Sequence, residues 1–381
     1  PNGVQSSYSY DVRNRLRRIE TVRGLATVLQ GLTYTLNANG TRASLTEDGG
    51  RTVVYRYDAL DRLVEEAVTD ASLGNRTTSW RYDAVGNRLS ETSVSGLGSE
   101  VVSYAYDAND RLLTETGPGG TTAYSYDANG NLTTRSEPGR TISYTWSDDE
   151  RLASATDATG TTSYRYDAEG IRHSRSAAGV TTNYLVDPNR AFAEVVAEED
   201  TLGNALARYT HAEELIAQRR AGATAFYHAD ALGSTRLLTD AAGNVTDQYV
   251  YEAFGETEAE TGATENAYRF TGEPLDEALG LYYLRARYMD PGQGRFVQVD
   301  PFPGRVGDPL TLHDYQYAHL NPVSNIDPSG EVTLVGLNTN IFNGASLRLA
   351  TGTSARVIIN RAAGRQVEGF VIAQLERFVA R

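Results

Sequence analysis

Cysteine and lysine are both absent from this chain of 381 residues, and histidine occurs only five times. Without cysteine the chain can form no disulfide and no zinc–thiolate site, and it can present no thiol nucleophile. The histidines are scattered without the spacing of metal ligands, so the sequence predicts no metal site and no cofactor. They are His173, His211, His228, His313 and His319.

Positive charge and long apolar runs are also scarce. The 35 basic residues, all of them arginine, face 49 acidic ones, which leaves a net charge of −14. This balance argues against binding of nucleic acid by the surface of the chain. No run of 18 apolar residues occurs, so we expect no membrane-spanning segment. No signal peptide is visible, and because the chain starts at Pro1 without Met, we expect it to be a fragment or a processed product.

Tyrosine, in contrast, is abundant, and much of it recurs in one motif. There are 24 Tyr against 9 Phe. The first aromatic residues of successive copies are separated by 47, 25, 24, 20, 20, 20 and 20 residues, and a worn copy, YTLNANGTR at Tyr34, divides the first interval. A constant step near 20 residues indicates a repeat architecture. The copies are YSYDVRNRL at Tyr8, YRYDALDRL at Tyr55, WRYDAVGNRL at Trp80, YAYDANDRL at Tyr104, YSYDANGNL at Tyr124, YTWSDDERL at Tyr144, YRYDAEGIR at Tyr164 and YLVDPNRAF at Tyr184.

One repeat has the pattern of a β-hairpin. In TTAYSYDANGNLTTRSEPGR the stretch TTAYSY is β-branched and aromatic, which is typical of a strand, and DANG has the residues of a tight turn. NLTTRSE then predicts the return strand, and PGR a second turn. A lone hairpin is marginal in water, so the units must join edge to edge into one long sheet that curls. The predicted fold class is therefore all-β.

The repeated residues are predicted to be architectural. We expect the first Tyr and the Leu or Val after the turn to pack between neighbouring hairpins, and the Asp to form the turn. The Arg after the turn is expected to pair with an Asp of an adjacent turn. The residues concerned are Tyr104, Tyr106, Asp107, Tyr124, Tyr126, Asp127, Tyr144, Tyr164, Tyr166 and Asp167.

The chain resembles a known family both in these repeats and in its later segments. The repeats are similar to the YD repeats of Rhs proteins, of the C components of insecticidal toxin complexes and of teneurins. Three later blocks resemble the Rhs repeat-associated core: residues 208–256 with DALGSTR, residues 268–302 ending in VQVDPF, and residues 315–330 ending in IDPSG. We therefore expect a repeat array over 1–205, a core over 206–330 and a variable tail over 331–381.

The resemblance implies a spiralling sheet that closes into a hollow shell around the chain's own C-terminal toxin. It implies a bacterial protein that is secreted or at the cell surface and serves bacterial competition. The expected partners are this toxin segment and a secretion apparatus or toxin-complex partner protein. The alternative is an extracellular adhesion module without enzymatic activity, in which exposed Tyr residues, Trp80 and Trp146 bind glycans. A third interpretation makes the tail an enzyme, such as a nuclease, although no complete motif supports it.

At most, the resemblance implies one chemical activity, an intramolecular aspartyl protease. The matching acids are Asp300 and Asp327, and Arg295 is expected to position them or balance their charge. Two carboxyl groups in one site share a proton, so the ionised one can activate water while the other polarises the scissile carbonyl. The cut is expected just after the DPSG motif, following Glu331, the residue after Gly330.

The position of Glu331 departs from the family pattern, which has a large apolar residue there. A carboxylate beside two acids adds like-charge repulsion. The competing interpretation is that both Asp-Pro pairs are only turns, since it explains Asp290 in YMDPG and Asp308 in GDPL equally well.

The tail after Gly330 no longer shows the repeat pattern. Its last part has apolar residues at helical spacing, which predicts an amphipathic helix. These residues are Val367, Phe370, Val371, Leu375, Phe378 and Val379.

Overall fold

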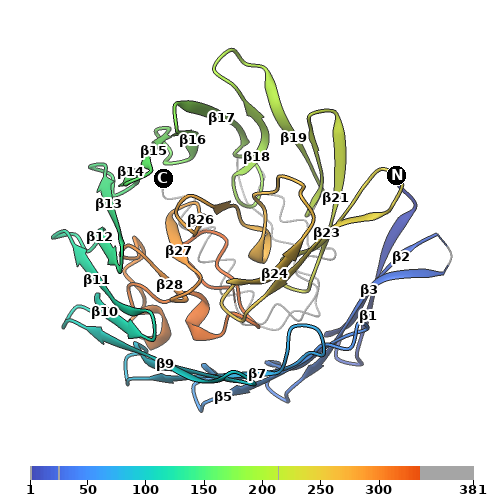
Figure 1. Ribbon diagram of the computed structural model, residues 1–381, viewed down its shortest axis with the longest axis horizontal. Coiled ribbons are helices and arrows are strands. Elements are labelled where there is room, and N and C mark those ends of the chain that lie inside the picture. Colours follow the sequence, from blue (N-terminus) through green and yellow to red (C-terminus); the bar gives the residue numbers. More distant parts are fainter. Residues whose placement is uncertain (1, 25, 213, 335–381) are drawn as a thin grey trace.

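The computed structural model describes residues 2–24, 26–212 and 214–334, and this part of the chain is built almost wholly of β-strands (Figure 1). Twenty-four strands form one antiparallel sheet. They are β1 (Val4–Tyr10), β2 (Leu16–Arg23), β3 (Thr27–Leu36), β4 (Arg42–Glu47), β5 (Thr52–Tyr57), β6 (Leu63–Thr69), β7 (Arg76–Tyr82), β8 (Arg88–Ser95), β9 (Gly98–Tyr106), β10 (Leu112–Gly117), β11 (Gly120–Tyr126), β12 (Leu132–Glu137), β13 (Arg140–Trp146), β14 (Leu152–Asp157), β15 (Gly160–Tyr166), β16 (Arg172–Ala177), β17 (Val180–Asp187), β18 (Glu194–Glu199), β19 (Ala205–His211), β20 (Leu215–Arg220), β21 (Ala223–Ala229), β22 (Thr235–Thr239), β23 (Val245–Tyr251) and β24 (Thr257–Thr261).

A second, small sheet of four strands follows. Its strands are β25 (Leu275–Asp276), β26 (Leu281–Leu284), β27 (Arg287–Asp290) and β28 (Arg295–Phe296), and three short 3-10 helices accompany it: η1 (Phe270–Gly272), η2 (Pro309–Thr311) and η3 (Ala318–Leu320). The large sheet curves around this segment, which lies inside the curve (Figure 1). The amphipathic helix expected in the tail lies outside the described residues.

Successive strands pair in sequence order, so the predicted all-β hairpin array is confirmed. The pairing runs β1–β2–β3 and onward without a crossover to β24. The worn copy at Tyr34 is a hairpin as well, formed by β3 and β4. The same sheet continues past residue 205 and ends at Thr261, so the change of architecture comes between β24 and β25.

The turn of each repeat is made by its aspartate. Asp107 Oδ1 accepts the backbone N–H groups of Asn109 at 2.9 Å and Arg111 at 3.0 Å, and Asp110 adopts φ 59°. The same bonds recur at Asp11, Asp58, Asp127, Asp167, Asp200, Asp230 and Asp240. An Asp side chain that binds backbone two and four residues ahead fixes the turn without help from elsewhere.

The arginine after the turn contacts its own turn as well as the next one. Arg111 forms an ion pair with Asp107 of its own turn at 2.6 Å, and its Nη1 donates to the backbone carbonyl of Asp127 in the next turn at 3.4 Å. Arg111 thus contacts an Asp of the adjacent turn as expected, but through the backbone carbonyl of Asp127, while its ion pair is with the aspartate of its own turn.

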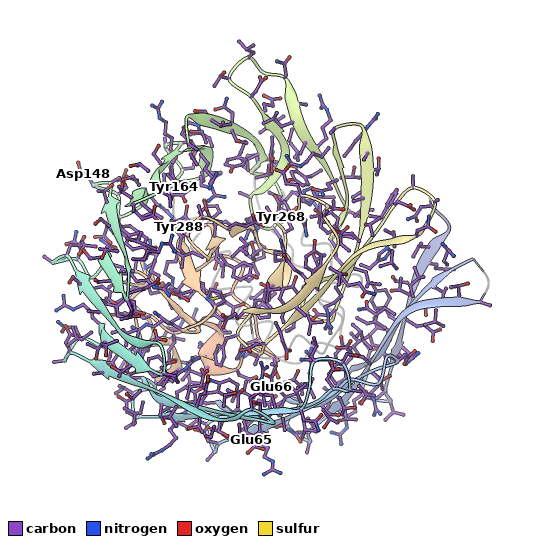
Figure 2. All side chains as sticks on the ribbon, viewed as in Figure 1. Glu65, Glu66, Asp148, Tyr164, Tyr268 and Tyr288 are labelled. Carbon is purple, nitrogen blue, oxygen red and sulfur yellow. The ribbon has the colours of Figure 1, made fainter. Side chains whose placement is uncertain are left out.

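Alternate residues of each strand face opposite sides of the sheet. Figure 2 shows Glu65 and Glu66 of β6 on the outer and inner faces. The inward faces of the repeats bury their first aromatic residue together with the Leu after the turn, for example Tyr124 at 5% and Leu132 at 3% exposure. Tyr104, Tyr124, Tyr144 and Tyr164 belong to one apolar cluster with Leu281, Tyr283, Tyr288 and Val297 from the segment inside the curve.

Where a repeat has a second aromatic residue, that residue can link it to the repeat before. The Tyr106 hydroxyl donates to the carbonyl of Arg88 at 3.0 Å, and that of Tyr166 donates to the carbonyl of Leu152 at 3.0 Å. The indole N–H of Trp146 takes the same place, donating to the carbonyl of Leu132 at 2.7 Å. Each bond ends at the start of the preceding return strand, so neighbouring hairpins are held together beyond their backbone ladder.

The sheet curls far enough for its last strands to meet its first. The Asn2 side chain donates to Thr239 Oγ1 at 2.9 Å, and Arg23 donates to Asn244 Oδ1 at 2.5 Å. Tyr34 accepts a hydrogen bond from the Ala231 N–H at 3.2 Å. The two ends of the sheet are therefore joined by side chains.

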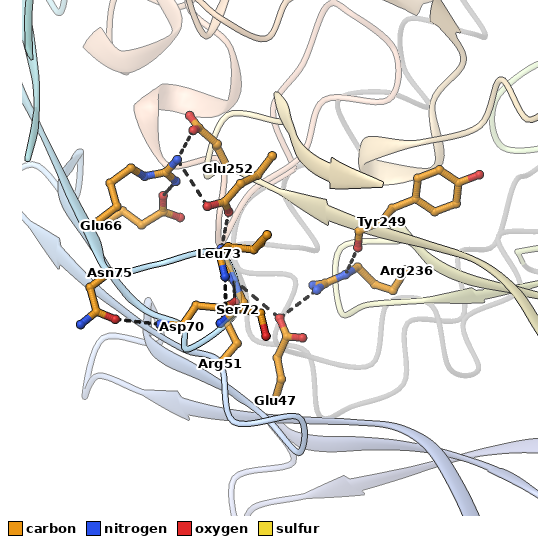
Figure 3. A network of polar contacts seen from close by, with 12 residues as sticks. Glu47, Arg51, Glu66, Asp70, Ser72, Leu73, Asn75, Arg236, Tyr249 and Glu252 are labelled. Carbon is orange, nitrogen blue, oxygen red and sulfur yellow. Dashed lines mark hydrogen bonds and ion pairs between the residues drawn. The ribbon is translucent and has the colours of Figure 1, made fainter. Parts of the chain in front are cut away.

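A network of charged residues completes this closure (Figure 3). Arg51 in the β4–β5 turn forms an ion pair with Glu258 of β24 at 2.5 Å, and Arg236 of β22 pairs with Glu47 at 2.8 Å. Arg76 of β7 contacts Glu66, Glu252 and Glu258. Burial raises the pKa of Glu66 and of Glu252 to about 7, and the neighbouring acids of the network act in the same direction.

The inward tyrosines are predicted to carry much of the stability of the array. Replacement of Tyr124, Tyr144 or Tyr164 by Ala should each cost roughly 2–5 kcal/mol, since each removes a buried ring. The midpoint of urea unfolding measures this loss. Val101→Ala on the outer face is the control, because Val101 is 52% exposed and its loss should change stability by less than about 0.5 kcal/mol. Equal midpoints for all four variants would contradict the assignment.

Glu66 is predicted to make the closure weaker at alkaline pH. The folded-state pKa of Glu66 is near 7, above the ordinary 4.5. Protonation of Glu66 therefore adds to the free energy of unfolding in full below about pH 4.5, and this stabilisation is lost as the pH rises through 7. Glu66→Gln mimics the protonated acid, so it should gain on the order of 1–3 kcal/mol relative to the parent between pH 5 and pH 8. Glu65→Gln, the neighbour on the outer face, should show no such gain in parallel unfolding curves.

Candidate active site

The candidate site is built around an arginine that lies almost completely buried inside the curve of the sheet. Arg287 is the first residue of β27 and is 1% exposed. Its Nη1 donates to the Asp314 carbonyl at 3.0 Å and its Nε to the carbonyl of Gly330. The guanidinium carbon lies 3.5 Å from the centre of the Phe296 ring. A buried cation of this kind requires nearby negative charge.

Asp300 and Asp327 supply that charge from two separate loops. Asp300 Oδ2 lies 2.7 Å and Asp327 Oδ2 3.4 Å from the same nitrogen, Nη2 of Arg287. The two carboxyl oxygens can therefore be no farther apart than those two distances together. The fold thus brings together two acids that are 27 residues apart in the sequence.

The two carboxyl groups have different surroundings. Burial raises the pKa of Asp300 to about 7 despite Arg287, and the charges of Asp327 and Glu331 act in the same direction. Asp300 Oδ1 accepts the N–H of Phe302 at 2.8 Å. Asp327 Oδ1 accepts two hydrogen bonds, from the Ser329 hydroxyl at 3.0 Å and the Val332 N–H at 3.1 Å. The raised pKa favours a protonated Asp300, whereas Asp327 Oδ1 accepts two hydrogen bonds from donors of its own loop.

Gly330 holds the loop against Arg287. Gly330 adopts φ 69°. A Cβ at this position would clash with the carbonyl oxygen of Leu284 and would lie 2.9 Å from the backbone nitrogen of Arg287. Only glycine combines that backbone conformation with such a close approach. The carbonyl of Ser329 accepts the N–H of Ala286 at 3.1 Å, and this bond ties the loop to the β26–β27 turn.

Arg295, the arginine expected to balance the two acids, lies elsewhere. Its Nη2 donates to the Asp110 carbonyl at 2.7 Å, and its guanidinium lies over the rings of Tyr106 and Tyr315. Within the described part of the chain, Arg287 is the cation that contacts both acids, so the expected role belongs to Arg287. The sequence did carry a signal for it: Arg287 interrupts LYYLRARYMD, whose strands β26 and β27 are buried at every position.

The Asp-Pro pairs at Asp290 and Asp308 have different surroundings. Asp290 forms an ion pair with Arg135 of β12 at 2.9 Å and accepts the N–H of Gly292 at 3.0 Å. Asp308 is exposed, and its carbonyl accepts the N–H of Thr311 at 3.0 Å. A turn role accounts for these two aspartates, whereas Asp300 and Asp327 combine turn bonds with a shared arginine.

A cavity of about 360 Å³ lies beside the DPSG loop, between β1–β2, strands β16–β21 and the inner segment. Pro328 and Ile326 of the loop line it, together with Arg285, Tyr184 and Tyr283. Its size suits a small molecule or an extended chain segment. In the part of the chain that the structure describes, no group of three or more His, Cys, Asp or Glu could hold a metal ion. No helix found there is long and apolar enough to cross a membrane.

The aromatic residues proposed for glycan binding are largely turned inward. Trp80 is 4% exposed and its ring packs edge-on against Phe254 at 5.4 Å, while Trp146 is half-buried. Tyr164 lies 5.8 Å from Tyr288 of the inner segment, and both are labelled in Figure 2. These rings form the interior of the molecule.

Comparison with known proteins assigns this fold. The family described as Teneurin YD-shell matches residues 21–187. Residues 21–187 therefore carry YD-repeat sequence. The crystal structure of TcdB2–TccC3–Cdc42 superposes on 87% of the chain with a TM-score of 0.69 at 20% identity, and the chain covers 18% of that structure. At that level of identity, the likeness shows that the YD-repeat fold is shared.

Curated relatives of the YD-repeat chain include several nucleases and toxins. The tRNA(Glu)-specific nuclease WapA of Bacillus subtilis subsp. natto is 44% identical over 108 residues, which are 28% of this chain and 5% of WapA. The double-stranded DNA deaminase toxin A of Burkholderia cenocepacia is 32% identical over 148 residues, 38% of this chain and 10% of the toxin. The chain thus spans a small part of each of these two relatives.

Arg287 is predicted to be essential for stability. Arg287→Met would leave two buried carboxyl groups without a cation, so it should cost about 3–5 kcal/mol at pH 8, and less at pH 5, where Asp300 is protonated. Urea unfolding at both pH values measures this. Arg56→Met removes an exposed arginine paired with Glu65 and should cost less than about 1 kcal/mol at either pH. A loss at Arg287 no larger than at Arg56 would contradict the prediction.

Proposed function

We propose that this chain forms the wall and closing end of an Rhs-type toxin shell, which encloses a C-terminal effector and cuts its own backbone after Glu331. The observation that carries the proposal is the convergence of Asp300 and Asp327 on Arg287, directly beside the DPSG loop. The YD-repeat fold and the toxin context of the relatives support the same conclusion. Secretion or surface display, with delivery by a partner apparatus, belongs to this proposal.

The self-cleavage would hydrolyse the peptide bond between Glu331 and Val332. Ionised Asp327 takes a proton from water, whose oxygen attacks the carbonyl carbon of Glu331, while protonated Asp300 gives its proton to the carbonyl oxygen. When the C–N bond breaks, Asp327 passes the proton to the Val332 nitrogen and Asp300 recovers its own. The products are a carboxyl group at 331 and an amine at 332, so atoms and protons balance.

Contacts of the DPSG loop support these assignments. The Val332 N–H lies 3.1 Å from Asp327 Oδ1, so the carboxyl that would protonate the leaving nitrogen is already beside it. Arg287 can stabilise the negative charge that develops between the two acids. The raised pKa of Asp300 keeps its proton available near neutral pH.

The encapsulating role draws on the curvature of the sheet. The YD repeats turn their aromatic faces inward, and the segment after β24 lies inside the curve and packs on those faces (Figure 1). The 360 Å³ cavity has the volume of a ligand pocket rather than that of a folded domain. An enclosed effector would therefore lie outside this cavity, or pass it as an extended chain.

Asp300→Asn and Asp327→Asn are each predicted to abolish cutting between Glu331 and Val332 without unfolding the chain. Asn keeps the amide-accepting oxygen of the turn but cannot exchange the proton that the hydrolysis requires. Intact mass spectrometry of the purified full chain measures the outcome. The parent should yield fragments of 331 and 50 residues.

Asp290→Asn and Asp308→Asn serve as matched controls, because both are Asp-Pro aspartates away from Arg287. They should cut like the parent. The rate of cutting should also fall as the pH rises through about 7, since Asp300 then loses the proton it must donate. A parent chain that stays whole across pH 5–8 would refute the self-cleavage and leave the shell purely structural.

A further inference from the structure

Ser329, the third residue of the DPSG motif, makes three hydrogen bonds at the proposed cut. Its hydroxyl donates to Asp327 Oδ1 at 3.0 Å. Its oxygen accepts the backbone N–H of Glu331 and that of Val332, both at 3.1 Å. A hydroxyl offers one donor and two lone pairs, so this side chain is fully used within the loop.

The hydrogen bonds of Ser329 determine which backbone N–H lies against the Asp327 carboxyl. The Val332 N–H is shared between Ser329 Oγ and Asp327 Oδ1, each 3.1 Å away. The preceding N–H, of Glu331, donates to the same Ser329 oxygen. The hydroxyl therefore holds two consecutive amides in a set order and leaves the second one against the carboxyl.

The same hydroxyl also orients the carboxyl itself. Asp327 uses Oδ1 for Ser329 and Val332, and this turns Oδ2 toward Arg287 at 3.4 Å. Without the Ser329 bond the carboxyl could rotate, and either oxygen could face either partner. One side chain thus aligns the acid and the bond that the acid would cut.

We propose that Ser329 is the positioning residue that selects the Glu331–Val332 bond for self-cleavage. This inference rests on the proposed function and extends it from the two acids to a specificity-determining group. Ser329 is not the nucleophile in this scheme, because its hydroxyl proton is committed to Asp327 and water supplies the attacking oxygen.

The test monitors the self-cleavage of full-length chain made by cell-free synthesis, with the cut bond assigned by intact mass spectrometry. Ser329→Ala should slow cutting about tenfold, the effect of losing one hydrogen bond to a charged group. It should also add fragments cut one residue away from Glu331. Ser329→Thr keeps the hydroxyl and should restore both the rate and the single cut.

Ser324→Ala is the matched control. Ser324 is buried in the same segment, but its hydroxyl accepts the N–H of Arg42 at 3.1 Å and so serves the start of β4 rather than the DPSG loop. It should cut at the parent rate and at the parent bond. Unfolding midpoints are compared in the Asp300→Asn background, which is expected to stay whole, so that stability is measured on intact chains.

The outcomes separate this inference from the function on which it rests. If the parent never cuts, the proposed self-cleavage fails whatever Ser329 does. If the parent cuts and Ser329→Ala matches it in rate and in fragments, the role of Ser329 is overturned. The role is also overturned if the alanine variant is slow only in proportion to a lower unfolding midpoint and threonine does not restore the cut.

Discussion

The fold is stabilised by a hydrogen bond that most repeats make with the repeat before them. The second aromatic residue donates its polar hydrogen to a carbonyl at the start of the preceding return strand, as Tyr106 does to Arg88 and Trp146 to Leu132. A single hairpin cannot satisfy this bond by itself. Each unit that makes this bond is therefore stabilised by its predecessor, as in other repeat proteins, whose stability comes largely from the units and their nearest-neighbour contacts.

The inward aromatic faces impose a second requirement, because a curved sheet with one apolar side must cover it. The chain does so with its own later residues: Leu281, Tyr283 and Tyr288 pack on one group of repeats, and Phe254 and Val323 on another. The segment that covers the inner face also contains charged residues that become buried with it. Arg287 is buried by this packing and is neutralised there by Asp300 and Asp327, so the candidate site is a by-product of closing the interior.

Much of this could be predicted from the sequence, because the information is local. The 20-residue step and the Asp at each turn determine hairpins that pair in order, and the buried first tyrosines result from strand alternation. The arginine after the turn was expected to contact an Asp of an adjacent turn, and Arg111 does so through the Asp127 carbonyl, but its ion pair with Asp107 of its own turn was not predicted. The bond of the second Tyr depends on the offset between hairpins, which no single repeat encodes.

The site shows the same division between local and long-range information. Asp300, Asp327 and Gly330 stand in recognisable motifs, whereas Arg287 is defined by long-range packing, and Arg295 in the more conspicuous motif contacts Asp110 instead. The large sheet likewise continues to Thr261, well past the copy of the motif at Tyr184. Composition and spacing describe the repeat well, and they say less about the side chains that the closed array places inside.

The join between the two ends of the sheet gives the molecule a seam. In the described residues β1 pairs only with β2 and β24 only with β23, and the ends meet through side chains such as Asn2, Arg51 and Arg236. The large sheet is therefore an open sheet that curls until its two edges meet, without backbone pairing between its first and last strands. Tension applied across it would separate the seam first and let the sheet unroll with every backbone ladder intact, so the shell has a built-in line of opening that costs no secondary structure.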